Sequence, residues 1–239
     1  MKQRIWELDA FRGICILGML IVHFIYDVVE IYGLLSWDYP PAFLLLKQWG
    51  GVFFLLLSGI CVTLGTKHIR RGSIVFLCGM LCTAVTGIYA RFTGSGSVFV
   101  IWFGVLHCLG LCMLLWALFR KLPTPALALI GALLAGLGLY LNEYCRADHP
   151  WLIFMGVVPF GFSSADYFPL LPHLGFFLLG AALGKVLYRQ KRTLFPKVSP
   201  CAPIVRFLSA CGRHSLLIYL LHQPVFMAVL SLISSGGNL

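Results

Sequence analysis

The stretch that decides the fold is Asp9-Ala10-Phe11-Arg12-Gly13-Ile14-Cys15-Ile16-Leu17-Gly18-Met19-Leu20-Ile21-Val22-His23-Phe24-Ile25-Tyr26-Asp27. It is apolar enough to form a helix inside a membrane, yet it carries Arg12, His23 and Asp27. At about 100° per residue these three side chains lie within about 60° of one another on a helix. Ionisable groups inside a bilayer are costly and usually face a protein interior or a wet cavity. The stretch therefore predicts a transmembrane helix with a polar, functional stripe.

The spacing along this helix separates two chemistries. Arg12 and His23 lie about 16 Å apart in helical rise, at about 1.5 Å per residue. We therefore expect Arg12 near one membrane surface and His23 deep in the bilayer. Asp9 and Glu30 fall on the same stripe. The alternative interpretation is a buried polar pair that only fixes helix packing.

Length and composition describe a membrane protein. The chain has 239 residues, of which 60% are hydrophobic and 11% charged, whereas a soluble domain carries about 25% charged residues. No stretch between the hydrophobic segments is long enough for a soluble domain, so we expect one transmembrane domain over residues 1–239. We expect no cleaved signal peptide, because no small-residue cleavage site follows the first apolar helix.

The expected fold class is all-α, a polytopic bundle of about seven transmembrane helices. A crossing helix needs about 20 mainly apolar residues. The expected spans are Ala10–Ile31, Ala42–Gly65, Gly72–Ala90, Phe99–Phe119, Thr124–Asn142, Phe168–Tyr188 and Arg213–Ser234. Trp151–Phe162 is shorter and contains Pro159, so we expect a re-entrant or interfacial piece. Residues 189–206 are basic and proline-rich and predict an irregular linker.

The basic residues indicate the orientation. All lysines and arginines except Lys47, Arg91 and Arg146 fall on one predicted side of the membrane. The positive-inside rule then predicts a cytoplasmic N-terminus and an extracytoplasmic C-terminus in a cell membrane. The net charge of +10 is explained by this orientation, so we expect no nucleic-acid partner.

Polar side chains recur in the predicted fourth, sixth and seventh helices. On the seventh helix Ser215, Tyr219 and His222 fall within about 60° of one another. Pro224 removes a backbone hydrogen bond two positions after His222 and frees a carbonyl group. Each histidine alone is also explained by a hydrogen bond to a neighbouring helix. The predicted pocket residues are His107, His173, Ser215, Tyr219 and His222.

A cationic rim is expected at the cytoplasmic mouth. Arginine suits phosphate because of its planar fork of donors, although membrane orientation alone also explains such charges. The sequence has no Walker or Rossmann glycine pattern. The candidate phosphate-binding residues are Arg12, Arg70, Arg71 and Arg213. We expect no metal, since the nine cysteines and the histidines lack metal-ligand spacing.

The motifs resemble two related groups of membrane enzymes. Arg12 and His23 match the arginine-then-ten-residues-then-histidine motif of the acyltransferase-3 family. The first helix, from Leu8-Asp9-Ala10-Phe11-Arg12-Gly13 to His23, resembles the bacterial branch related to heparan-alpha-glucosaminide N-acetyltransferase. Three further blocks share this resemblance: Trp102-Phe103-Gly104-Val105-Leu106-His107-Cys108, Phe168-Pro169-Leu170-Leu171-Pro172-His173-Leu174-Gly175 and Gly212-Arg213-His214-Ser215-Leu216-Leu217-Ile218-Tyr219-Leu220-Leu221-His222-Gln223-Pro224.

The resemblance implies an acyltransferase that passes an acetyl group from cytoplasmic acetyl-CoA to a hydroxyl or amine of an extracytoplasmic carbohydrate. The animal enzyme has its proposed active histidine in the outer segment after the first helix, and residues 33–38 contain no histidine. This chain is also shorter, with fewer helices than that enzyme. The heparan substrate is therefore not carried over.

A mechanism follows as a hypothesis. The four arginines bind the CoA phosphates, His23 acts as general base, and Asp27 orients the imidazole. A covalent acetyl-imidazole is the variant route. The competing class is a proton-coupled transporter of a small solute, which inverted repeats would favour, and we find none. The sequence leaves open the acceptor, the oxyanion donors and a homodimer, to which Gly180 and Gly184 are relevant as a close-packing pair.

Overall fold

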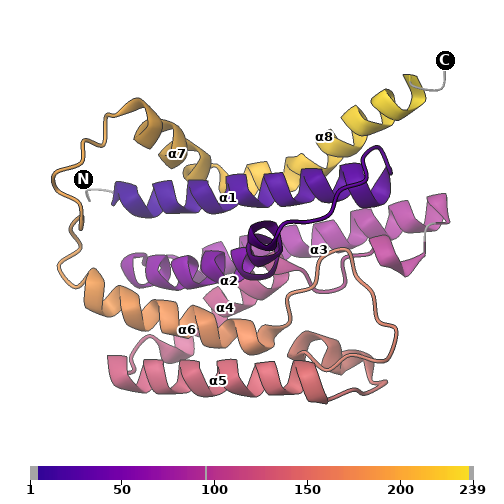
Figure 1. The fold of residues 1–239 in the computed structure, drawn as a ribbon. Helices are drawn as coiled ribbons and strands as arrows, with labels where there is room; N and C mark the ends of the chain where they lie inside the picture. Colours follow the sequence, from indigo (N-terminus) through magenta and orange to yellow (C-terminus); the bar gives the residue numbers. More distant parts are fainter. Residues whose placement is uncertain (1–4, 95, 237–239) are drawn as a thin grey trace. The chain divides into compact units, whose positions relative to one another are not determined.

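The computed structural model describes residues 5–94 and 96–236 (Figure 1). The regular elements in these residues are all helical, and the only β-pairing among them is two isolated bridges. Six helices within this described part of the chain are long and apolar enough to cross a membrane, and Val105–Phe119 is apolar but shorter. The prediction of an all-α polytopic bundle is confirmed, and the chain is a multi-pass membrane protein.

The chain divides into two compact units, which are described separately. The first contains residues up to 54 and those from 192 onward, and the second contains residues 55–191. Helix α2 (Pro41–Leu64) begins in the first unit and ends in the second. The expected single domain over residues 1–239 stays a prediction.

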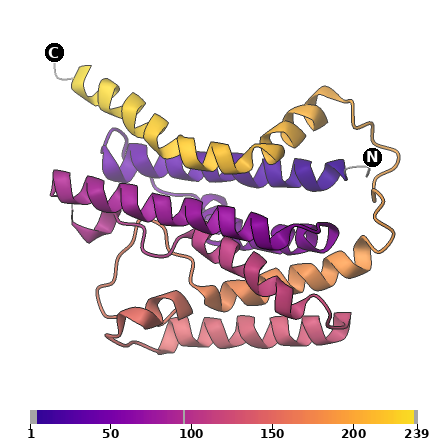
Figure 2. The same cartoon turned by 180° about the vertical axis from the view of Figure 1, so that it is seen from behind.

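In the first unit, α7 (Pro203–Arg213) and α8 (Ser215–Gly236) both pack against α1 (Trp6–Tyr26), and Figures 1 and 2 show all three helices. A Cβ on Gly13 would overlap the carbonyl group of Leu208, and a Cβ on Gly212 would overlap that of Asp9. Glycine at both positions therefore lets the backbones of α1 and α7 touch, as small residues do between membrane helices.

The boundaries of α7 and α8 correct two predictions. Residues 189–206 were expected to be irregular throughout, but α7 begins at Pro203 and continues to Arg213. Arg213 therefore ends α7 and does not open the last span, which begins at Ser215. Proline suits the first turn of a helix because its φ is fixed and its missing N–H is not needed there. A search for apolar stretches of about 20 residues overlooks a helix this short.

A buried carboxylate ties the linker before α7 to the start of α1. Glu7 is only 1% exposed. Its two oxygens accept hydrogen bonds from the Thr193 hydroxyl at 2.9 Å and the Leu194 N–H at 2.8 Å. The carboxylate thus has the donors that a buried charge requires.

The second unit contains two close helix pairs, visible in Figure 2, which are α3 (His68–Thr93) with α4 (Val105–Phe119) and α5 (Thr124–Tyr144) with α6 (Leu170–Leu187). Trp151–Phe162 contains most of the 3-10 helix η3 followed by irregular backbone, and it is not a span; its re-entrant or interfacial placement stays a prediction. The elements are α3 (His68–Thr93), η2 (Ser97–Phe99), α4 (Val105–Phe119), α5 (Thr124–Tyr144), η3 (Pro150–Met155) and α6 (Leu170–Leu187).

The paired glycines of α6 pack within the chain. A Cβ on Gly180 would overlap the carbonyl group of Leu56, and a Cβ on Gly184 would lie 2.9 Å from the backbone of Ile60. Both contacts are with the end of α2. This close approach accounts for the pair without a second copy of the chain.

Helix α4 begins later than predicted, at Val105 instead of Phe99. The non-helical backbone before it is satisfied by other segments of the second unit. The Thr83 hydroxyl donates to the carbonyl oxygen of Ile101 at 2.6 Å, and the Thr86 hydroxyl accepts from the Ile101 N–H at 3.1 Å. Further bonds join Trp102 to Ser164, Phe103 to Phe168, and Val105 to Asp166. Non-helical backbone is tolerated at membrane depth when protein groups supply its partners.

Candidate functional site

A pair of histidines forms the centre of the candidate site in the first unit. His23 of α1 and His222 of α8 lie edge to face, with ring centroids 4.9 Å apart. His222 is 8% exposed, and its Nδ1 lies 2.5 Å from the carbonyl oxygen of Tyr219. Because a carbonyl only accepts, Nδ1 carries the proton, and Nε2 of the neutral ring is an acceptor. The structure thus brings His23 of α1 together with Tyr219 and His222 of α8, three residues that the sequence predicted on two separate helices.

Aromatic side chains lie next to this pair. The ring of Phe226 lies 5.8 Å from the His222 ring and 5.3 Å from the Phe24 ring, between centroids. Pro224 lies inside α8, which bends partway along its length in Figure 2. The histidine pair therefore has aromatic neighbours where α1 and α8, two membrane-spanning helices, meet.

Asp27 lies one turn beyond His23 and is 1% exposed. Its two carboxylate oxygens accept hydrogen bonds from Nε2 of Gln223 at 2.9 and 3.1 Å. The sequence predicted that Asp27 would orient the His23 ring, whereas the donor that the structure places on the carboxylate is Gln223. Sequence analysis missed Gln223, although a buried carboxylate needs a donor and Gln223 follows His222 directly.

A double-mutant cycle tests the pairing of Asp27 and Gln223. A hydrogen bond to a charged group contributes about 1.5–3 kcal/mol, so we expect Gln223→Leu to lower the free energy of unfolding by about that amount. The same change should cost less in an Asp27→Asn background, because the buried group is then neutral. Thermal denaturation of the purified wild type, both single variants and the double variant measures the coupling. Additive losses would contradict it.

Arg12 and Arg213 lie at the opposite end of α1 from the histidine pair. The Arg12 guanidinium is 3.8 Å from the Asp9 carboxylate, and both side chains are partly exposed. Arg213 follows Gly212, whose backbone meets that of Asp9. An exposed ion pair of this kind adds little stability, so Arg12 keeps its capacity to bind a further anion.

Three other predicted residues lie at the starts of their own helices. Arg70 and Arg71 lie exposed in the first turn of α3, in the second unit. Ser215 opens α8, about 10 Å of helical rise before His222.

Two histidines predicted for the pocket lie in the second unit. Nδ1 of His107 accepts from the Gly104 N–H at 3.2 Å, and Nε2 lies 3.3 Å from the Thr83 hydroxyl. Both ring nitrogens are thereby satisfied at the start of α4, which favours a structural role. His173 Nδ1 lies 2.7 Å from the Pro169 carbonyl oxygen, to which it donates. These contacts match the alternative of histidines bonded within the helix bundle.

An aromatic cluster, defined as Trp37, Tyr39 and Phe43, follows the histidine-bearing end of α1. Its ring centroids are separated by 4.9 to 5.7 Å, and the Lys47 ammonium lies 5.8 Å from the Tyr39 centroid. The Tyr39 hydroxyl donates to Glu30 at 3.0 Å. Burial, and then the Glu30 carboxylate, raise the pKa of Tyr39, so its hydroxyl stays protonated and remains a donor.

These features define a class of protein. The chain is a multi-pass membrane protein with ionisable groups gathered between its helices, and such groups usually serve function. Residues 4–224 match the family described as "Heparan-alpha-glucosaminide N-acetyltransferase, catalytic". The match covers most of the chain, which therefore belongs to this family, and the family indicates a transmembrane acetyltransferase. Comparison with curated proteins and with solved structures finds no match.

Proposed function

We propose that the protein transfers an acetyl group from acetyl-CoA to a hydroxyl or amine of an extracytoplasmic carbohydrate, with His23 as general base. The observation that carries the proposal is the contact between His23 and His222 in membrane-spanning helices of an acetyltransferase family. An imidazole is the side chain best suited to accept and return a proton near neutral pH.

The donor reaches His23 from the end of α1 that carries Arg12 and Arg213. Helix α1 is continuous from Trp6 to Tyr26, so about 16 Å of rise separates Arg12 from His23. That distance is of the order of the pantetheine arm of CoA. Arg12 and Arg213 bind the phosphates, and the predicted role of Arg70 and Arg71 in the second unit stays a prediction from the sequence. The excess of basic residues on this side supports a cytoplasmic location for this end.

The chemical step is an acyl transfer. The acceptor oxygen or nitrogen attacks the thioester carbonyl carbon while His23 takes its proton. The carbon–sulfur bond then breaks, and the CoA thiolate leaves and takes the proton from the His23 imidazolium. The products are the acetylated acceptor and CoA. His222, Tyr219 and Ser215 are the candidate donors to the developing oxyanion.

Asp27 supports the charged imidazole. A carboxylate one turn from His23 stabilises the imidazolium that forms during transfer, and Gln223 holds this carboxylate in place. Gln223 Oε1 is buried and has no hydrogen-bond partner among residues 5–94 and 96–236. It is the candidate group to accept a hydrogen bond from the acceptor substrate.

The aromatic cluster supports a carbohydrate acceptor. The C–H face of a sugar packs on aromatic rings such as those of Trp37 and Tyr39, while its hydroxyl groups bond to charged side chains such as Glu30 and Lys47. This cluster lies beyond the end of α1 that carries His23. The acceptor would therefore approach from the side opposite to the donor.

Transfer of labelled acetyl groups tests the proposal. Purified protein in lipid nanodiscs is incubated with acetyl-CoA labelled in the acetyl group and with a panel of hexosamines and neutral sugars. We expect release of the CoA thiol together with label in one class of sugar. Thiol release at the rate of a protein-free control, with every sugar tested, would contradict the proposal. A transporter would instead move solute across proteoliposomes without releasing thiol.

A further inference from the structure

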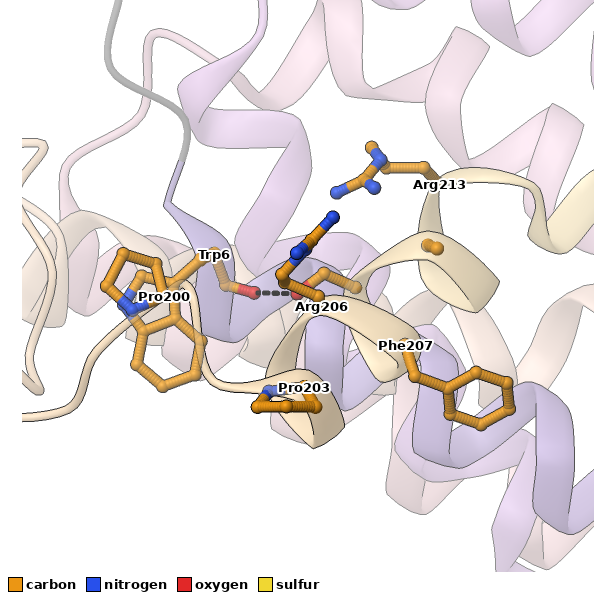
Figure 3. Close-up of a pocket in the computed structure, with 8 residues that line it drawn as sticks. Trp6, Pro200, Pro203, Arg206, Phe207 and Arg213 are labelled. Carbon is orange, nitrogen blue, oxygen red and sulfur yellow. Dashed lines mark hydrogen bonds between the residues drawn. The ribbon is translucent and has the colours of Figure 1, made fainter.

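A pocket of about 540 Å³ lies inside the first unit, between the start of α1 and α7 (Figure 3). Its size falls within the range of about 300–1,000 Å³ that is usual for small-molecule sites. Trp6 contributes from α1, and Arg206 and Arg213 contribute from α7. Pro200 and Pro203 form the wall where the linker enters α7.

The walls of this pocket are held together by contacts already described. The Ser209 hydroxyl of α7 donates to the Trp6 carbonyl oxygen at 3.4 Å, and Gly212 lets α7 touch α1 at Asp9. The buried Glu7 carboxylate holds the linker at Thr193 and Leu194. The pocket is therefore built before any ligand enters, which reduces the entropic cost of binding.

Two arginines and no acidic residue line the pocket, and the nearby Glu7 and Asp9 carboxylates of α1 are occupied by Thr193 and Leu194 and by Arg12. Figure 3 shows the guanidinium groups of Arg206 and Arg213 pointing toward one another. The sequence contains no Asp or Glu after Asp166, and the one ion pair among the described residues joins Arg12 to Asp9. Two converging guanidinium groups suit a doubly charged anion such as a phosphate monoester, whose oxygens can each accept hydrogen bonds from them.

An indole ring completes the recognition surface. Trp6 lines the pocket, and its ring lies 6.4 Å from that of Phe195, between centroids. An aromatic face next to arginine forks is the combination that binds a nucleobase and its phosphate. The side chains that line this pocket therefore suit a phosphorylated nucleoside.

We propose that this pocket binds the adenine and the 3′-phosphate of coenzyme A, with Arg206 and Arg213 on the phosphate and Trp6 against the base. The inference rests on the proposed function, because it places the nucleotide end of the same donor. Trp6 precedes His23 by 17 residues of continuous helix, or about 26 Å of rise. A ligand that occupies both places needs a long arm between its nucleotide and its reacting group, and coenzyme A has one.

Comparison of CoA with 3′-dephospho-CoA tests the phosphate contact. The dissociation constants are measured by calorimetry on the purified full-length protein in neutral-lipid nanodiscs. Hydrogen bonds to charged groups predict roughly 10- to 100-fold tighter binding of CoA by the wild type. In Arg206→Gln this ratio should fall toward one, with little change in the affinity for 3′-dephospho-CoA.

Three further variants complete the design. Arg206→Lys keeps the charge without the planar fork and should give an intermediate ratio. Trp6→Leu should weaken both ligands by a similar factor, roughly 5- to 100-fold for a stacked base. Lys197→Gln removes a charge from the same linker outside the pocket and should leave both affinities unchanged. Melting temperatures of all variants verify that they are folded.

The outcomes separate this inference from the proposed function. An unchanged CoA to 3′-dephospho-CoA ratio in a folded Arg206→Gln protein that still transfers acetyl groups would overturn the inference alone. A wild type that binds neither ligand would overturn both. Native mass spectrometry of the protein in nanodiscs with anionic phospholipid tests whether the pocket instead binds a lipid phosphate. If Arg206→Gln loses bound anionic lipid while its nucleotide ratio is unchanged, the pocket holds a lipid phosphate and the inference is wrong.

Discussion

The His23→Ala variant is expected to lose acetyl transfer by a factor of about 10² to 10⁴, the usual contribution of a general base. The protein should still insert into the membrane and bind CoA, because the proposed phosphate contacts lie about 16 Å away along α1. The measurement is the rate of labelled acetyl transfer at saturating acetyl-CoA, with calorimetric CoA binding on the same preparation. A loss of rate with retained binding identifies His23 with the chemical step.

The matched control for this variant is His149→Ala. His149 is an exposed histidine immediately before η3, outside the pair formed by His23 and His222. Its replacement should leave the transfer rate unchanged. His222→Ala should lower the rate because its ring lies edge to face with that of His23. If His23→Ala turned over at the wild-type rate, the assignment of the general base would be wrong.

The Gly212→Ala variant is expected to destabilise the protein by about 1–3 kcal/mol, the usual cost of overpacking. The added Cβ would overlap the Asp9 carbonyl group, so α7 must move away from α1. That movement also displaces Arg213, and we expect weaker CoA binding as a second effect. Thermal denaturation in detergent measures the first effect, and calorimetry measures the second.

Gly136→Ala is the matched control, because a Cβ at this position of α5 would meet open space. Alanine is favoured over glycine inside a helix by about 1 kcal/mol. The two alanine substitutions should therefore change the melting temperature in opposite directions. A Gly212→Ala protein as stable as the wild type would show that α1 and α7 do not touch at this point.

Much of the candidate site was accessible from helical periodicity. The 3.6-residue repeat places Arg12, His23 and Asp27 on one stripe, and the structure holds His23 and Asp27 against α8. The repeat fails after Asp27, where the chain forms the π-helix η1 (Asp27–Ile31). A π-helix has more residues per turn, so Glu30 leaves the expected stripe, and it accepts a hydrogen bond from Tyr39 instead.

Other features depend on contacts that periodicity does not report. In the sequence Glu7 is an ordinary charged residue near the N-terminus. Only the fold shows that Thr193 and Leu194 donate hydrogen bonds to it. The pocket at Trp6 and Arg206 is formed partly by α7, and this helix is too short to be predicted as a membrane span. Residues 100–104 are apolar enough to extend a helix, but hydroxyl groups distant in sequence hold them in another conformation.

The partners of residues 100–105 have a consequence for how the chain enters a bilayer during synthesis. Helix α4 has 15 residues, about 22 Å of rise, which is short of the roughly 30 Å hydrocarbon core. Threonines that satisfy the backbone before it emerge from the ribosome earlier, whereas Ser164, Asp166 and Phe168 emerge some 60 residues later. Between those moments several peptide groups lack partners. During synthesis, water or the translocon must therefore supply hydrogen-bond partners to these peptide groups until the later segment arrives.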